Sequence, residues 1–265
     1  SMEREITLSP QGFQAIAEWL YRQTGVLLSD QKRFMVQTRL MRRLKARSLP
    51  DFQAYTRYLL SDPDERERAI DLLTTHETFF FRDVHQFKAL EEYIKQLPLR
   101  PLSIWSAACS TGEEAYTIAM ILAHAGRLDF RILGTDISLD CLTRGRLAEY
   151  PIEASARIPE AYLKKFCWKG VGPRQGIFRM DRTLTDRIHF ERHNLLQAAP
   201  AEDFDLIFLR NVLIYFDEAT RQRVLRHAQR SLRSSGLLFL GTAETVRLES
   251  RDLISYRPGI YRKAL

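Results

Sequence analysis

Residues 103–114 read SIWSAACSTGEE, and this stretch decides the fold class. Its apolar start predicts a buried strand, its small residues predict a tight turn, and its acidic end predicts a helix that continues to His124. Such a turn lets a ligand approach the backbone, and amides at the helix start favour anionic or hydroxyl-bearing ligands. The turn matches neither the dinucleotide pattern G-x-G-x-x-G nor a phosphate-binding loop ending in Gly-Lys-Ser/Thr. Taken alone, it is explained as well by a compact crossover as by a ligand site.

Short apolar runs alternate with helical patterns on the C-terminal side of this stretch. We expect strands at 103–107, 131–135, 188–191, 205–209 and 237–240, and helices at 113–124, from 139 onward, and at 218–232. This alternation is typical of an α/β fold whose parallel sheet is covered by helices on both faces. Residues 256–262 would close the sheet as a hairpin partner. The glycine-rich residues 160–185 are expected to form a small β insertion, because an irregular loop of that length would be unusual.

Before residue 85 the pattern is helical throughout. A first helix is expected over Phe13 to Tyr21, with Ser9-Pro10 as its start signal, and further helices at 32–45, 51–60 and 65–73. We therefore expect a helical N-terminal domain at 1–85 and an α/β domain at 86–265, with the β-subdomain insertion at about 157–187.

Composition narrows the class of protein. The 265 residues carry a net charge of +7, which favours an acidic partner such as nucleic acid, a membrane surface or an acidic protein. The three cysteines are scattered, and no Cys or His spacing is typical of zinc, so neither disulfides nor a metal are expected. No stretch approaches the ~18 apolar residues needed to cross a bilayer, and no signal peptide is evident at the N-terminus. We expect a cytosolic protein without direct membrane insertion.

An acidic residue ends the second expected strand. Asp136 lies 24 residues beyond Gly112, close to the separation at which an α/β fold places the carboxylate that binds a ribose hydroxyl pair. Helix capping is the alternative role for Asp136, but Ser138 is also well placed to cap. Asp136 is therefore a candidate ligand-binding residue.

Polar residues also follow the third and fourth expected strands. Asn194 and Leu195 could hold the edge and the face of a purine. Arg210 and Asn211 come directly after a buried run, at the carboxyl edge where open α/β sheets bind ligands. Tyr215 follows them, and core packing is the alternative role for its ring.

Two further segments stand out. Residues 74–83 read TTHETFFFRD, and three aromatics flanked by polar groups suggest a lid. His76-Glu77 within it lacks the second histidine that a helical metal site needs. Residues 39–47 carry five positive charges and no acidic residue. A solvated helix face is the default explanation of such a run, but its purely basic character favours a docking surface.

Four segments, taken in order, resemble the CheR-type chemotaxis receptor glutamate methyltransferases. They are LTTHETFFFR (73–82), WSAACSTGEE (105–114), NLL (194–196) and RNVLIYFD (210–217). The resemblance extends over nearly the whole chain. It implies a helical N-terminal domain and a Rossmann-like S-adenosylmethionine-dependent methyltransferase domain with a small antiparallel β-subdomain insertion. The implied activity is methylation of glutamate side chains of methyl-accepting chemotaxis receptors.

The resemblance also implies a set of site residues. Arg82 would pair with the methionine carboxylate of the cofactor, and Arg82 with Tyr215 would shape the pocket beside the reacting methyl group. Either Glu113 or its neighbour Glu114 would face the cofactor, and the family often has Asn where His76 stands. No metal is implied, and the product would be S-adenosylhomocysteine. The implied cofactor contacts are His76, Thr78, Arg82, Glu113, Asp136, Asn194, Leu195, Arg210 and Asn211.

Partners follow from the same resemblance. The basic helix would contact the acidic methylation region of the receptor's cytoplasmic domain through Arg39, Arg42, Arg43 and Arg47. The β-subdomain would bind a C-terminal receptor peptide by strand addition, and the protein would be recruited to cytoplasmic receptor arrays. A nucleic-acid methyltransferase is the main alternative, but the chain lacks the interleaved aromatic and basic residues of a single-strand binding surface. A non-catalytic sensor that binds the cofactor is the second alternative.

Overall fold

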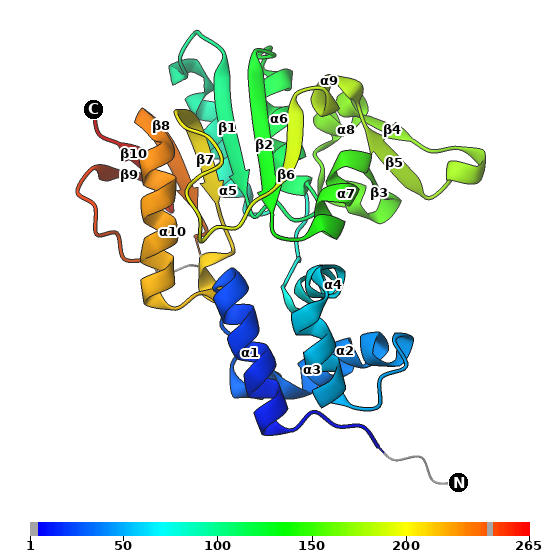
Figure 1. The fold of residues 1–265 in the computed structure, drawn as a ribbon. Helices are drawn as coiled ribbons and strands as arrows, with labels where there is room; N and C mark the ends of the chain where they lie inside the picture. The colour runs from blue at the N-terminus through cyan, green and yellow to red at the C-terminus, as the bar shows by residue number, and fades with distance from the viewer. Residues whose placement is uncertain (1–4, 243–245) are drawn as a thin grey trace. The chain divides into compact units, whose positions relative to one another are not determined.

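The computed structural model describes residues 5–242 and 246–265, which form two compact units (Figure 1). The first, called the helical unit below, comprises the chain up to Thr75 together with Tyr215–Thr220. The second, the α/β unit, comprises His76–Ile214 and Arg221–Leu265. Among the described residues, no helix combines the length and apolarity required to cross a membrane.

Local capping signals fix where the helices of the helical unit begin. Ser9 accepts a hydrogen bond from the Gly12 amide (2.9 Å) at the start of the first helix, and Asp51 and Asp62 cap the third and fourth. Proline occupies the first position of the first and fourth helices, where its missing N–H costs nothing. The helices are α1 (Pro10–Thr24), α2 (Arg33–Ala46), α3 (Phe52–Ser61) and α4 (Pro63–Leu73), with a 3₁₀ turn η1 (Asp30–Lys32) before α2.

The α/β unit is built on a seven-stranded sheet within the described residues, in the order β6-β2-β1-β7-β8-β10-β9. The first five strands in this order are parallel, and β10 and β9 add an antiparallel hairpin at the β8 edge. The strands are β1 (Leu102–Ala107), β2 (Phe130–Asp136), β6 (Ile188–Arg192), β7 (Phe204–Leu209), β8 (Leu232–Leu240), β9 (Leu253–Arg257) and β10 (Ile260–Lys263). The parallel sheet with a closing hairpin confirms the sequence prediction.

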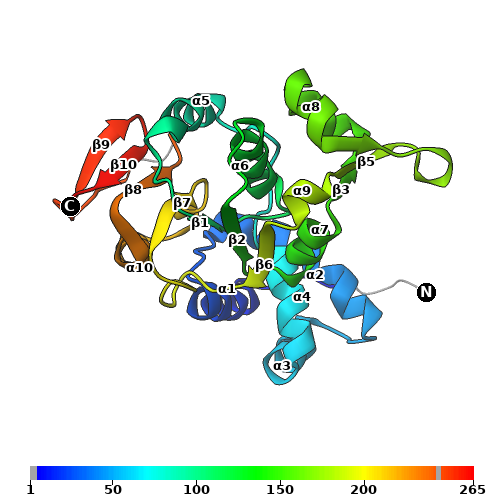
Figure 2. The same ribbon diagram turned by 90° about the horizontal axis from the view of Figure 1, so that it is seen from above.

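Helices cover both faces of this sheet, which confirms the expected α/β class. Figure 2 shows α5 and α6 along one face and α10 along the other. All six residues of β7 are buried, as expected for a central strand packed on both sides. The helices are α5 (Val84–Tyr93), α6 (Glu113–His124), α7 (Leu139–Leu147), α8 (Glu160–Phe166), α9 (Arg182–Thr185) and α10 (Glu218–Ser231).

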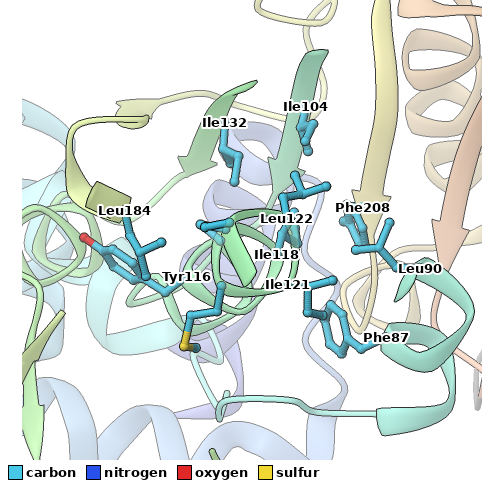
Figure 3. Close-up of a cluster of buried hydrophobic side chains, with 14 of the residues drawn as sticks. Phe87, Leu90, Ile104, Tyr116, Ile118, Ile121, Leu122, Ile132, Leu184 and Phe208 are labelled. Atoms are coloured by element: carbon cyan, nitrogen blue, oxygen red, sulfur yellow. The ribbon is translucent and has the colours of Figure 1, made fainter. Parts of the chain in front are cut away.

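The core of the unit lies between α5, α6 and the sheet (Figure 3). Phe87 of α5 stacks on Phe208 of β7 with ring centroids 6.2 Å apart, and Phe208 stacks on Phe239 of β8 at 4.2 Å. Nearly every residue of α6 is buried, because this helix packs on the sheet and on α5. This packing fixes the start of α6, and with it the turn that follows β1.

A separate antiparallel sheet forms the expected small β-subdomain. Its order is β3-β5-β4, with β3 (Glu149–Pro151), β4 (Cys167–Lys169) and β5 (Ile177–Met180). The first strand begins before the insertion expected at about 157. Ala148 adopts a left-handed conformation (φ 58°) at the end of α7, which turns the chain directly into β3. A three-residue strand ending in proline offers too little pattern to be recognised in the sequence.

The two units divide between Thr75 and His76, before the boundary expected at 85/86. Phe80 and Phe81 explain the difference, because both are buried in the α/β unit. Phe80 packs edge-on against Tyr150 (4.9 Å between centroids), and Phe81 packs against Phe87 (5.9 Å). The aromatic run that suggested a lid at the junction is therefore anchored in the core.

Candidate functional site

The turn after β1 is strained and tightly held. Ala108 and Ser110 have positive φ values of 55° and 52°, and Gly112 has 99°. A non-glycine residue in this region costs about 1–3 kcal/mol and persists only where its surroundings impose it. The Cys109 amide donates to the Thr135 carbonyl (2.8 Å), and the Ser110 amide donates to Asp136 Oδ2 (2.9 Å). The end of β2 thus holds the turn in a conformation typical of ligand-binding loops.

Asp136 is the buried acid at the centre of this arrangement. Its residue surface is 6% exposed, and its Oδ1 accepts the Ser138 amide (3.0 Å) while Oδ2 accepts that of Ser110. Burial raises the pKa of Asp136, and the amide of Ser138 and the nearby His76 oppose the rise. Ser138 caps α7 through its own hydroxyl, so Asp136 is not the cap. Each carboxylate oxygen retains a lone pair that a ligand hydroxyl could use.

The adjacent acids at the start of α6 have different surroundings. Glu114 accepts a hydrogen bond from Ser106 Oγ (2.6 Å) and forms an ion pair with Arg210 Nε (2.9 Å). Glu113 accepts from Thr111 Oγ1 (2.5 Å), and burial raises its pKa. Glu114 is therefore committed to a structural ion pair, which leaves Glu113 as the better candidate for ligand contact.

Arg210, at the carboxyl end of β7, joins several segments. Its side chain is only 2% exposed, and besides pairing with Glu114 it donates from Nη1 to the Arg82 carbonyl (2.9 Å) and to Gln86 Oε1 (3.1 Å). Its guanidinium also lies over the Phe87 ring, 4.6 Å from the centroid. A guanidinium engaged in this way braces the site, and the direct cofactor contact expected from the resemblance stays a prediction.

The segment from His76 to Arg82 borders the turn. The His76 carbonyl accepts from Ser110 Oγ (2.8 Å), and His76 and Thr78 are partly buried. Phe81 has a positive φ of 58°, and its amide donates to Thr117 Oγ1 of α6 (3.2 Å). Arg82 is partly buried, donates to the Glu77 carbonyl (2.9 Å) and lies 5.5 Å from the Phe79 ring centroid. This strained segment and the turn are held against each other.

Polar residues at the ends of β6 and β7 complete the edge. Asn194 Oδ1 accepts the Leu196 amide (3.0 Å), and Asn194 and Leu195 are both partly buried. The His193 amide donates to the Asp136 carbonyl (3.1 Å), which places this loop beside the end of β2. Asn211 has a positive φ of 61° and is partly buried. The carboxyl ends of β1, β2, β6 and β7 thus carry the expected polar groups, as open α/β sheets require of a ligand site.

Tyr215 belongs to the helical unit, unlike the other expected site residues. It ends a short 3₁₀ turn, η5 (Leu213–Tyr215), and is the first residue of the segment that clusters with the helical unit. Its carbonyl accepts the Leu27 amide (2.9 Å). The α/β unit by itself therefore assembles the other expected site residues without Tyr215.

The four basic residues expected to dock the receptor lie in α2 and at its C-cap, and they differ in their contacts. Arg43 forms two hydrogen bonds with Glu65, at 3.0 and 2.7 Å, and the Glu65 side chain is fully buried. Arg47 Nε lies 3.8 Å from the same carboxylate, and Arg39 donates to the Leu72 carbonyl (3.0 Å). Arg42 is exposed. The expected docking surface is thus also part of the scaffold of the helical unit.

Several site residues escaped the sequence patterns. The Ser110 amide donates to Asp136, and the Ser110 hydroxyl donates to the His76 carbonyl. The side-chain oxygen of Gln86 accepts a hydrogen bond from Arg210. Cys141, in the first turn of α7, lies with His76 and Asp136 in a group whose potential metal-ligating atoms are all within 4.8 Å of one another. No spacing rule connects these residues, because they come from separate segments that only the tertiary fold brings together.

The geometry is suited to binding a nucleoside. Asp136 offers acceptors for a hydroxyl pair, the turn offers backbone groups in an open left-handed conformation, and the loop at Asn194 offers an amide and an apolar side chain. Because the buried carboxylate of Asp136 retains acceptor capacity at the sheet edge, the residues fit the adenosyl group of a methyl-donor cofactor.

Comparison with known proteins gives two family matches. Residues 76–259 match the model described as CheR methyltransferase, SAM binding domain, and residues 11–74 match the model described as CheR methyltransferase, all-alpha domain. Together these matches include most of both units.

Curated relatives agree with these matches. Chemotaxis protein methyltransferase 2 of Pseudomonas aeruginosa is 40% identical over 98% of this chain and 96% of its own length. The chemotaxis protein methyltransferase of Escherichia coli is 37% identical over 92% of this chain and 86% of its own length. Among solved structures, the CMeT domain of the citrinin polyketide synthase is similar at a TM-score of 0.39 and 19% identity, covering 69% of this chain and 40% of that chain. Family assignment rests on the models and the curated relatives.

Proposed function

Because the chain belongs to the CheR methyltransferase family, we propose that it methylates specific glutamate side chains of bacterial chemoreceptors during chemotactic adaptation. Family membership makes it an S-adenosylmethionine-dependent methyltransferase. The receptor substrate is inferred from the relatives, which are named chemotaxis protein methyltransferases. The structural observation that carries the proposal is the buried Asp136 carboxylate, held beside a strained turn with acceptor capacity left for a ribose.

The site residues divide into ligand contacts and a brace. Asp136 would accept the ribose hydroxyls, Asn194 and Leu195 would hold the adenine, and Glu113 would contribute a further polar contact. His76, Thr78, Arg82 and Asn211 would surround the methionine end of the cofactor, with Arg82 pairing with its carboxylate. We assign Arg210 to bracing Glu114, Gln86 and the Arg82 backbone.

The chemistry requires little of the protein beyond positioning. When bound, S-adenosylmethionine supplies an activated methyl group on its sulfonium. A substrate glutamate, with a pKa near ~4.3, is already ionised at neutral pH, so no general base is needed. The residues of the site would align the carboxylate with the methyl group and exclude water, which can contribute several kcal/mol to catalysis. Arg82 and Tyr215 would shape the region around the reacting groups without transferring protons.

A methyl-transfer assay tests the proposed reaction. The native chain, radiolabelled S-adenosylmethionine and the cytoplasmic fragment of a chemoreceptor should give label on the fragment that is released by mild base, because carboxyl methyl esters hydrolyse readily. Base-stable label on the fragment, or label on added RNA or DNA in its place, would refute glutamate methylation. Absence of methyl transfer with intact cofactor binding would favour a sensor.

We propose that the exposed part of α2 docks the receptor. An Arg42→Glu variant should raise the KM for the receptor fragment by about 5- to 10-fold at low salt, because an attraction becomes a repulsion. The Kd for S-adenosylhomocysteine should not change. Arg43 is unsuitable for this test because of its bond to buried Glu65. Equal effects on receptor KM and cofactor Kd, or no effect on either, would mean that Arg42 does not dock the receptor.

A receptor C-terminal peptide could add to β4, an edge strand of the β-subdomain. Trp168 of β4 is 60% exposed, whereas Trp19 and Trp105 are 3% and 2% exposed, so Trp168 reports binding at this edge. The peptide should blue-shift the tryptophan emission, and Trp168→Phe should abolish the shift. A scrambled peptide is the control. Peptide binding by calorimetry without any change in emission would argue against the β4 edge.

Location follows from the substrate. We propose that the chain acts in the cytoplasm, where the receptor methylation regions lie, and is recruited there to receptor arrays. Fluorescent fusions that stay diffuse in cells with intact arrays would count against recruitment.

A further inference from the structure

Three side chains of different chemistry converge beside the turn after β1. His76 precedes α5, Asp136 ends β2, and Cys141 lies in the first turn of α7. Each offers one potential ligand atom, and these three atoms lie within 4.8 Å of one another. Asp136 and Cys141 are buried at 6% and 3% exposure, while His76 is partly buried. The cluster is part of the α/β unit alone.

The donor set selects a class of metal. An imidazole nitrogen, a carboxylate oxygen and a cysteine sulfur suit Zn²⁺, whereas Mg²⁺ and Ca²⁺ prefer oxygen ligands throughout. Zinc bonds of about 2.0–2.3 Å require ligand atoms somewhat closer together than 4.8 Å. The two buried ligands are held by α7 and β2: Ser138 Oγ accepts the Cys141 amide (3.1 Å), and Asp136 accepts two backbone amides. His76, the third ligand of the set, is partly buried and lies in the segment that precedes α5.

We propose that His76, Asp136 and Cys141 bind Zn²⁺, with a fourth position open to solvent, and that the bound ion excludes the cofactor. The thiol proton passes to solvent when sulfur coordinates the ion. Zn²⁺ and the cofactor compete for Asp136, because the amides of Ser110 and Ser138 already occupy one acceptor position on each of its oxygens. The remaining positions serve either the ion or a ribose hydroxyl pair. The inhibitory part of this inference rests on the proposed function, whereas metal binding does not.

Cobalt provides a test that needs neither cofactor nor receptor. Co²⁺ added to the native chain in a non-chelating reductant should give a thiolate-to-cobalt charge-transfer band, saturating at one equivalent and bleached by Zn²⁺. Cys141→Ser should abolish the band and His76→Asn should weaken Co²⁺ binding. Cys167→Ser, in β4 and outside the cluster, should retain it, as should Cys109→Ser at the turn. Absence of the band in the native chain, or its survival in Cys141→Ser, would overturn the site.

Calorimetry with S-adenosylhomocysteine tests the competition. Its affinity is first measured with metal removed, and failure to bind at that stage would count against the proposed function and not against the zinc site. With free Zn²⁺ tenfold above its own Kd, the apparent Kd for S-adenosylhomocysteine should rise about elevenfold. Cys141→Ser should remove most of this rise. Equal affinity for S-adenosylhomocysteine with and without bound Zn²⁺ in the native chain would overturn the proposed exclusion.

Discussion

An Asp136→Ala variant should bind S-adenosylhomocysteine at least about 100-fold more weakly than the native chain. Two hydrogen bonds from ribose hydroxyls to a carboxylate contribute about 1.5–3 kcal/mol each, and about 1.4 kcal/mol corresponds to a tenfold change in Kd. The carboxylate is already buried and oriented by the Ser110 and Ser138 amides, so little further ordering is required on binding. Isothermal titration calorimetry with S-adenosylhomocysteine measures the effect.

Two further variants separate ligand binding from folding. Asp136→Asn preserves the side-chain shape and one acceptor oxygen, so it should fold and still lose about tenfold or more in affinity. Asp140→Ala is a matched control, because this acid lies close by on α7 with its side chain 62% exposed and pairs with Arg144 at the surface (3.4 Å). It should bind normally. Native affinity in folded Asp136→Ala and Asp136→Asn would remove Asp136 from the site.

An Arg43→Ala variant should lower the free energy of unfolding of the helical unit by about 3 kcal/mol. Removing one partner of a buried ion pair costs about 3–5 kcal/mol, because the other charge stays buried. Among the described residues, the fully buried Glu65 would keep the Tyr55 hydroxyl (2.9 Å) and Arg47 at 3.8 Å. Because Arg47 would still partly neutralise Glu65, we expect the loss of stability to lie at the lower end of this range. Urea unfolding followed by fluorescence of Trp19, buried in α1, reports on this unit.

The comparison variant lies one position away on the same helix. Arg42 is exposed, and Arg42→Ala should change the free energy of unfolding by no more than about 0.5 kcal/mol. Both variants remove one positive charge, so a difference between them isolates the contact with Glu65. Equal stability of the two variants would mean that the Arg43–Glu65 pair contributes little, and Arg43 would then be available for docking.

Helix starts and strand cores could be predicted because their causes are local. Ser9, Asp51, Asp62 and Ser138 cap the helices that follow them, and each is a residue type whose side chain accepts an amide within its own turn. The buried runs in β1 and β7 follow from the apolar pattern of central strands. Asp136 belongs to this class as well, since its position at a strand end follows from chain order.

The remaining features depend on partners that are distant in the chain. Arg210 was predicted as a ligand contact from its position after a buried strand, but its bonds to Glu114, Gln86 and the Arg82 carbonyl could not be predicted. Arg43 was predicted as a docking residue from its basic helix, but its ion pair with the buried Glu65 could not be predicted. The two units divide after Thr75 and not after residue 85, because Phe80 and Phe81 are buried in the core of the α/β unit. Each of these features depends on a side chain that is distant in sequence and adjacent in the fold. The spacing of residues within one segment does not predict such contacts.

The short segment Tyr215–Thr220 clusters with the helical unit although it is encoded between β7 and α10. Leu27 donates to the Tyr215 carbonyl (2.9 Å), the Tyr21 hydroxyl donates to Asp217 Oδ2 (2.6 Å), and Phe216 is 4% exposed. Cutting the gene at residue 75 would therefore not yield two complete proteins. The C-terminal fragment would contain residues Tyr215–Thr220 without the helices that they pack against, and the Phe216 ring would become exposed. Evolution could exchange the helices of this unit for another set only if the replacement also packed against residues Tyr215–Thr220.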